Sequence, residues 1–182
     1  MRQSKSRFDV LGHLGSLRRY ARSLTRDDTD AEDLVQEALM RAYERRSTFK
    51  PDRNVRNWLL SILHNVFIDR LRASRSETER NSHAAEMADT IAEPGQDHAV
   101  RLAQVRENFM SLPKEQRAAL HLVAVEGLSY GEAAAALDIP VGTLMSRISR
   151  ARAALRAMEE TLGRRPPVDT HLRVVGGENE SD

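Results

Sequence analysis

Apolar residues recur at helical spacing in three segments of this 182-residue chain, whereas the alternating runs typical of strands are few. In the first segment, Thr29 and Glu32 have the spacing of a capping box, which predicts a helix that begins there and ends near Arg46. The predicted buried face of this helix consists of Leu34, Val35, Ala38, Leu39, Ala42 and Tyr43. The pattern predicts an all-α fold.

The second segment, residues 55–75, has a broad apolar face and predicts a long helix. The residues predicted to be buried are Trp58, Leu59, Ile62, Leu63, Val66, Phe67 and the stem of Arg70, with Leu71 at the edge. A second, mostly polar stripe comprises Ser61, Asn65, Ile68 and Arg72. The amide of Asn65 suits a nucleobase edge, although an exposed asparagine is ordinarily only solvated.

The third segment, residues 129–156, predicts two helices separated by a tight turn. Ser129 and Glu132 form another capping box, and the helical pattern breaks at Asp138, Ile139 and Pro140. It resumes at Val141, after which one predicted core stripe contains Leu144, Ile148, Ala151 and Leu155. This arrangement is the outline of a helix-turn-helix that reads DNA.

The surface of the second of these helices carries only positive charge. No acidic residue occurs between Val141 and Met158, and arginine can bind phosphates or fork onto a guanine edge. A solvated basic face on a structural helix is the alternative, but the capped helix and short turn before it favour DNA contact. The candidate groove residues are Thr143, Met145, Ser146, Arg147, Ser149 and Arg150.

Charge is distributed unevenly along the chain. The net charge of +1 conceals +6 in residues 1–75, −5 in residues 76–99, +3 in residues 100–165 and −3 in residues 166–182. We therefore predict two small helical domains, residues 1–75 and 100–162. They are joined by a flexible acidic linker, residues 76–99, with a short helix around residues 84–91. Residues 163–182 are predicted to be a disordered tail.

Several function classes lack any support in the sequence. The chain has no cysteine, and its six histidines lack the spacing of metal ligands. No pairing of nucleophile and base, phosphate loop or cofactor motif can be picked out, so we expect neither an enzyme nor a bound cofactor or metal. No signal peptide or apolar run of membrane length is present, and the expected location is cytoplasmic.

Two long motifs resemble one family. GLSYGEAAAALDIPVGTLMSRISRARAALR, preceded by LPKEQRAALHLVAVE, is similar to region 4 of bacterial extracytoplasmic-function (ECF) sigma factors, which reads the minus 35 promoter element. Residues 29–75, TDAEDLVQEALMRAYERRSTFKPDRNVRNWLLSILHNVFIDRLRASR, resemble region 2, which binds the polymerase clamp and the minus 10 element. Within the family, the phrase VEGLSYGEAAAALDIPVGTLMSRISRAR looks most like the alphaproteobacterial general-stress (EcfG-type) subgroup.

The resemblance implies roles for residues of the first two segments. Asp33, Gln36 and Glu37 are the expected contacts to the beta-prime clamp of core RNA polymerase. From the residues alone, stabilisation of the helix start by these acidic groups is an equally good account. Residues 47–54 predict a polar loop, which in this family captures a base flipped from the minus 10 element. The minus 10 candidates are Lys50, Arg53, Asn54, Ser61, Asn65 and Arg72.

The expected function is therefore that of a sigma subunit whose partners are core RNA polymerase, promoter DNA and an anti-sigma factor. One alternative is a sigma-like mimic that sequesters an anti-sigma factor without binding DNA. It would need neither the arginines of the second helix nor the basic loop. A conventional helix-turn-helix regulator is the other alternative, and it would carry a sensor domain where residues 29–75 stand.

Overall fold

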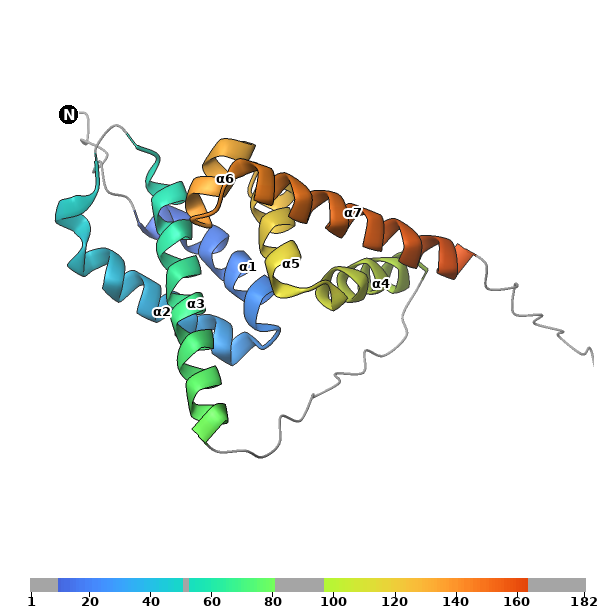
Figure 1. The fold of residues 1–182 in the computed structure, drawn as a ribbon, viewed down its shortest axis with the longest axis horizontal. Coiled ribbons are helices and arrows are strands. Elements are labelled where there is room, and N and C mark those ends of the chain that lie inside the picture. The colour runs from blue at the N-terminus through green and yellow to red at the C-terminus, as the bar shows by residue number, and fades with distance from the viewer. Residues whose placement is uncertain (1–9, 51–52, 81–96, 164–182) are drawn as a thin grey trace, which may run out of the picture.

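The computed structural model describes residues 10–50, 53–80 and 97–163, and within them the regular structure is entirely helical (Figure 1). The all-α prediction is confirmed. The N-terminal half contains η1 (Leu11–His13), α1 (Leu14–Thr25), α2 (Asp28–Glu44), η2 (Arg46–Thr48) and α3 (Val55–Arg80). The C-terminal half contains α4 (Asp97–Ser111), α5 (Lys114–Leu120), η3 (His121–Val125), α6 (Tyr130–Ala136) and α7 (Val141–Gly163).

Helices α1, α2 and α3 pack around one core. The core takes Leu17, Tyr20 and Leu24 from α1, together with most of the residues predicted for the other two helices. Those buried as predicted are Leu34, Val35, Ala38, Ala42, Leu59, Ile62, Leu63, Val66 and Phe67. Trp58 is partly buried, with its ring centroid 5.2 Å from that of Phe49.

The two ends of α2 differ from the prediction. The N-cap is Asp27, whose side chain accepts from the backbone N–H of Asp30 at 2.9 Å, so the predicted Thr29 capping box is wrong. Glu32 instead lies 2.9 Å from Arg18 of α1. At the other end Tyr43 is 65% exposed, because its ring lies under the Arg46 guanidinium, 4.1 Å from the centroid, rather than in the core.

The C-terminal half confirms the predicted helix-turn-helix. Both hydrogen bonds of the capping box between Ser129 and Glu132 are present at the start of α6. Asp138 takes a left-handed conformation, φ 52°, in the turn, and α7 begins at Val141 as predicted. Three residues of the predicted stripe, Leu144, Ile148 and Ala151, are buried, and Leu155 packs at the edge.

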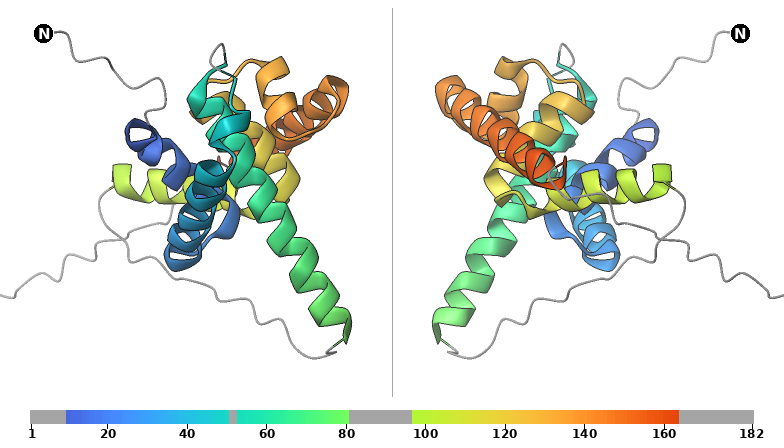
Figure 2. Two further views of the ribbon diagram at one scale, coloured as in Figure 1. Left: turned by 90° about the vertical axis from the view of Figure 1, so that its left-hand side faces the viewer. Right: turned by 90° about the vertical axis from the view of Figure 1, so that its right-hand side faces the viewer.

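The two halves pack against each other. Helix α1 lies beside α5 and η3, and α3 lies beside α6, as Figures 1 and 2 show. The last turns of α3 project beyond this body. Between η3 and α6, Gly127 adopts φ 68°, a conformation that disfavours residues with a Cβ.

The predicted acidic linker is only partly described. Helix α3 continues to Arg80 and α4 already begins at Asp97, so both ends of residues 76–99 are helical. The remainder of the linker, including the short helix predicted around residues 84–91, lies outside the described residues, as does the predicted tail after Gly163. The domain limits stay predictions.

Candidate nucleic-acid interface

Four of the six predicted groove residues share the exposed surface of α7. Met145 is 52% exposed, and Ser146, Ser149 and Arg150 are exposed beside it. Ser146 Oγ donates to the Gly142 carbonyl at 3.0 Å. Arg150 Nε donates to the Ser146 carbonyl at 3.3 Å, and its two terminal nitrogens take no part in this bond. The group offers a thioether, hydroxyls and a guanidinium on the second helix of the helix-turn-helix.

The other two predicted groove residues, Thr143 and Arg147, are only half-exposed. Arg147 lies close enough to the N-terminal half to affect His64 of α3. Burial first, and then the positive charge of Arg147, lower the pKa of His64 to about 4. The His64 ring is therefore neutral at pH 7, and its Nδ1 lies 3.0 Å from the Tyr20 hydroxyl. Arg147 thus sits at the edge between α7 and α3 rather than at the centre of the exposed face.

The minus 10 candidates divide into two groups. Arg53, Asn54 and Ser61 line one cleft between the start of α3 and α6, where Glu132 and Ala135 form the opposite wall. Asn54 also begins α3, because its Oδ1 accepts from the backbone N–H of Asn57 at 3.3 Å.

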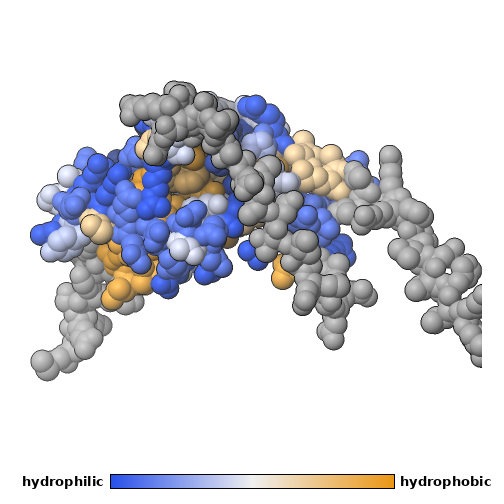
Figure 3. Space-filling model, turned by 90° about the horizontal axis from the view of Figure 1, so that it is seen from below, coloured by the Kyte–Doolittle hydropathy of each residue, from blue (hydrophilic) through white to orange (hydrophobic). Residues whose placement is uncertain are grey.

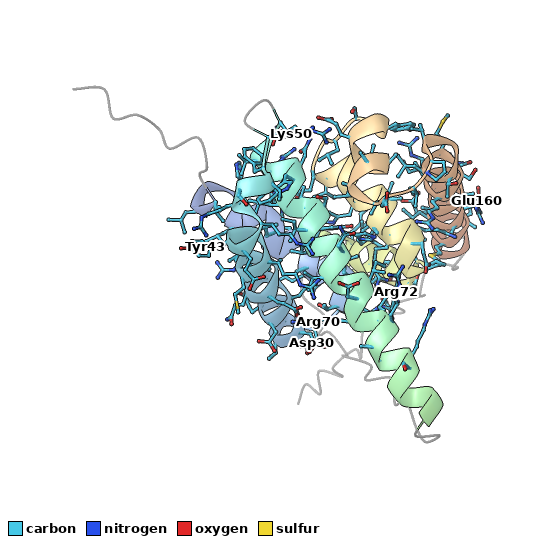
Figure 4. The ribbon with its side chains drawn as sticks, turned by 60° about the vertical axis from the view of Figure 1, so that its left-hand side comes forward. Asp30, Tyr43, Lys50, Arg70, Arg72 and Glu160 are labelled. Atoms are coloured by element: carbon cyan, nitrogen blue, oxygen red, sulfur yellow. The ribbon has the colours of Figure 1, made fainter. Side chains whose placement is uncertain are left out.

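The second group lies outside this cleft. Lys50 is exposed in the loop between α2 and α3, and Asn65 and Arg72 are exposed farther along α3. Figure 4 places Lys50 and Arg72 well apart. A nucleic-acid strand that contacts all six candidates has to run from the loop along α3.

The acidic face of α2 is partly occupied by internal ion pairs. Glu37 accepts from Arg41 at 3.0 Å and from Arg70 of α3 at 2.8 Å, and Arg41 also bonds Asp69 at 2.6 Å. The hydrogen bond that Arg41 donates to Asp69 is the main reason that the pKa of Arg41 is raised. Glu37 therefore has a structural role in joining α2 to α3.

Other side chains of α2 are open to solvent. Asp33 and Gln36 are exposed, and so are the apolar side chains of Met40 and Tyr43, both 65% exposed. Figure 4 shows Tyr43 and Asp30 near opposite ends of this helix. On the face seen in Figure 3, apolar patches interrupt a largely hydrophilic surface. Exposed apolar side chains next to acidic ones are typical of a protein-binding surface.

Two buried charges were missed by sequence reasoning. Arg117 and Glu126 flank the mainly apolar stretch of residues 118–125, and a charged residue next to such a stretch could have been a signal. Burial alone would raise the pKa of the Glu126 carboxyl, but the His121 ring, the Ser16 hydroxyl and the Arg19 charge together lower it to about 2. Burial and the nearby charge of Arg26 lower the pKa of Arg117 to about 10, so Arg117 stays protonated at neutral pH.

The two helical halves match two regions of the sigma-70 proteins. Residues 10–77 match the family Sigma-70 region 2, and residues 102–155 match Sigma-70, region 4. The chain is 38% identical over 173 residues to the ECF RNA polymerase sigma factor EcfG of Rhodopseudomonas palustris, with 94% of this chain and 95% of that protein covered. This chain belongs to the ECF sigma factors, and below the two halves are called region 2 and region 4.

Solved structures agree with this membership. The sigma factor RpoE in complex with the anti-sigma factor NepR, from Bartonella quintana, has a TM-score of 0.71 and 33% identity, covering 82% of this chain and 93% of that one. CnrH in complex with the cytosolic domain of CnrY has a TM-score of 0.59 and 32% identity, covering 84% and 85%. The PhyRSL–NepR complex from Sphingomonas sp. Fr1, at 21% identity and a TM-score of 0.60, shares the fold.

No helix in residues 10–50, 53–80 and 97–163 combines the length and the apolar character needed to cross a membrane.

Proposed function

We propose that this sigma factor directs core RNA polymerase to promoters by reading the minus 35 element with α7 and the minus 10 element with the start of α3 and the loop before it. The observation that carries the proposal is the exposed face of Met145, Ser149 and Arg150 on the second helix of a helix-turn-helix. A chain that only copied the sigma fold to bind a protein would not require this basic, acid-free face.

At the minus 35 duplex, the α7 face supplies three kinds of contact. The Arg150 guanidinium suits the two acceptors of guanine, and the Ser146 and Ser149 hydroxyls suit either base edges or phosphates. Met145 is apolar and exposed, which fits contact with a thymine methyl group. Arg147, at the edge of the face, suits a phosphate.

At the minus 10 element, the proposal combines positive charge with a polar cleft. Lys50, Arg53 and Arg72 attract a displaced single strand, and Asn54 and Ser61 offer hydrogen bonds to one flipped base. Asn65 is exposed on α3, where its amide suits a base edge.

Docking on core polymerase is assigned to α2. Asp33 and Gln36 are exposed there, and Met40 and Tyr43 add apolar surface that binding would bury. Glu37 takes part from the edge, because Arg41 and Arg70 already hold its carboxylate. We assign the partner on the polymerase side to the beta-prime clamp by family membership.

Control by an anti-sigma factor is the remaining part of the proposal. It is supported by the similarity to RpoE and CnrH, each solved in complex with an anti-sigma factor or a domain of its partner. The similarity to EcfG along 94% of the chain favours a role in a general stress response.

Reconstitution tests the proposal directly. The purified chain is mixed with core polymerase and a panel of promoter templates, and specific transcripts are measured. We expect transcripts from a subset of the templates, and their loss when the minus 35 element is scrambled. A chain that yields no transcript from any template, yet binds an anti-sigma factor tightly, would be a mimic instead.

A further inference from the structure

A pocket outside both candidate DNA surfaces lies where α1, α4 and η3 meet. Its volume is about 440 Å³, within the range of pockets that bind small molecules. Its lining includes three arginines and three apolar side chains, Arg19, Arg22, Arg106, Phe109, Met110 and Val125. None of the residues assigned to DNA or to core polymerase lines it. The proposed function therefore gives this pocket, called below the α1–α4 pocket, no role.

Three guanidinium groups reach the α1–α4 pocket from two helices. Arg19 and Arg22 of α1 are about half-exposed, and Arg106 of α4 is exposed. Arg19 uses Nε and Nη2 to bond Glu126, and Arg22 Nε lies 2.8 Å from Asp28 Oδ1. Arg106 forms no ion pair with any other residue of the described part of the chain. Donor groups of Arg22 and Arg106 are thus available to a ligand.

Positive charge exceeds negative charge around the pocket. Asp28 is the acidic residue in its lining, and the side chain is 77% exposed. Glu126 has no exposed side-chain surface, and its carboxylate is shared between Arg19 at 3.1 Å and Arg56 at 3.7 Å. These groups, four arginines and two carboxylates, carry a net charge of +2. A phosphate monoester has a charge of about −1.5 to −2 at pH 7, so the two are complementary.

An apolar wall lies beside these cations. Phe109 is partly buried, with its ring centroid 6.3 Å from that of His121, and Met110 is half-buried next to it. Val125 is 51% exposed, although His121 and Leu122 of the same η3 segment are buried. A flat ring placed against this wall would bury apolar surface and contact the Phe109 ring favourably. Cations next to an aromatic wall suit a phosphate that is attached to a ring.

We infer that the α1–α4 pocket is a binding site for a nucleoside monophosphate, in which Arg22 and Arg106 hold the phosphate while Phe109 and Val125 cover the base. The planar fork of arginine donates two hydrogen bonds to one phosphate, which makes it suited to this task. Arg19 adds positive charge from the same helix as Arg22. The inference goes beyond the proposed function and does not depend on it.

Isothermal titration calorimetry of the full-length chain tests the site. The probes are the monophosphates of adenosine, guanosine, cytidine and uridine, together with the four nucleosides, ribose 5-phosphate and inorganic phosphate. We expect saturable one-to-one binding of at least one nucleotide. Its affinity should exceed that of inorganic phosphate, and that of its own nucleoside, by about tenfold or more, because each of these keeps only one half of the recognised molecule.

Arg106→Ala distinguishes this pocket from the other basic surfaces. Arg106 is exposed, so the fold should tolerate its loss, and nucleotide affinity should fall about tenfold or more with the loss of a charged hydrogen bond. Arg101→Ala is the matched control, because Arg101 is also exposed on α4 but does not line the pocket. Arg150→Ala controls for binding to the α7 face. Both controls should bind nucleotide as the wild type does.

Phe109→Leu tests the apolar wall. It should weaken binding of the nucleotide and leave binding of inorganic phosphate unchanged, because only the base contacts this wall. The inference is wrong if no nucleotide binds saturably, if inorganic phosphate binds as tightly as every nucleotide, or if Arg150→Ala lowers the affinity and Arg106→Ala does not. Transcription is measured separately, so a chain that initiates at promoters but binds no nucleotide would refute this inference and leave the proposed function standing.

Discussion

Arg117 and Glu126 are charged side chains whose surroundings are supplied largely by the other half of the molecule. A buried guanidinium is tolerated when backbone carbonyls accept its hydrogen bonds, and Arg117 has four such acceptors. Glu126 is tolerated because a hydroxyl and a cation meet its carboxylate. Each of these residues makes the packing of the two regions specific.

Replacing Arg117 should be among the most destabilising changes in this chain. Arg117→Met keeps much of the side-chain volume but removes the donor that the carbonyls of Ser23, Leu24 and Leu112 share, while Met110 keeps the bond from Arg26, so we expect a loss of about 3 kcal/mol. Urea unfolding followed by circular dichroism measures it. Arg18→Met, which removes a half-exposed pair with Glu32, should cost less than about 1 kcal/mol. Equal losses for the two variants would contradict the assigned role of Arg117.

Arg150 is the residue through which the minus 35 assignment is best tested. If its guanidinium forks onto a base, Arg150→Ala should weaken binding to a promoter duplex by about 1 to 3 kcal/mol and leave a scrambled duplex unaffected. Fluorescence anisotropy with both duplexes measures the difference, and Arg156→Ala, farther along α7, is the control. A similar loss on both duplexes would indicate a phosphate contact, and no loss on either would show that the groove face is assigned wrongly.

At the scale of elements, α2 combines a structural edge with a binding surface. Glu37 joins it to Arg70 of α3 at 2.8 Å, whereas Asp33 and Gln36 point to solvent. The helix dipole favours acidic residues near the start of α2 whatever they bind. The structural account thus applies to Glu37, and the polymerase-binding account applies to Asp33.

Two substitutions distinguish the structural role of α2 from its role in binding core polymerase. Glu37→Gln should lower the free energy of unfolding by up to about 1 kcal/mol, because it weakens a half-exposed ion pair. Asp33→Ala should change it by less than about 0.5 kcal/mol and should still weaken binding to core polymerase. Unfolding curves and a competition assay for core polymerase give both quantities. If Asp33→Ala binds core polymerase as the wild type does, α2 docks through other residues.

Local sequence patterns predicted a helix well where one face of the helix is apolar and a capping motif marks its first residue. Residues 129–156 met both conditions, and α6, the turn and α7 begin where expected. The start of α2 was wrong because Asp27, Asp28, Thr29 and Asp30 are all competent N-caps, and spacing alone chose the wrong one. Tyr43 was misassigned because the helical period includes it, whereas its ring lies under the Arg46 guanidinium instead of in the core.

For the whole molecule, sequence reasoning predicted two basic helical units but not their packing. No local period links Ser16 to Glu126 or Asn57 to Glu132, because these contacts join segments distant in sequence. The candidate DNA residues were therefore identified by type and spacing. Their division into an open face on α7 and a cleft covered by α6 required the tertiary structure.

The stability of the packed molecule should depend on pH through His64. The pKa of this buried ring is about 4 in the folded chain, against an ordinary 6.5, so acid protonates the unfolded chain first. Stability is complete above pH 6.5 and falls as the pH drops toward 4. We expect a loss of about 2 kcal/mol between pH 7 and pH 5, measured by urea unfolding.

A matched variant isolates this effect. His64→Gln keeps a polar group beside the Tyr20 hydroxyl but cannot titrate, so its stability should change less over the same pH range. Arg147→Gln should also reduce the slope, because the positive charge of Arg147 is one of the causes of the low pKa of His64. An unchanged slope in His64→Gln would assign the pH dependence to other groups.

Gly127, at φ 68°, immediately follows the buried Glu126. A Cβ at this position would meet no atom within 4 Å, so Gly127→Ala adds backbone strain without a clash, at a cost of about 1 kcal/mol. That strain falls on the loop that carries the Glu126 carboxylate to Ser16 and Arg19. A single torsional preference, at a residue whose side chain would touch no partner, thus bears on how well the two regions fit together.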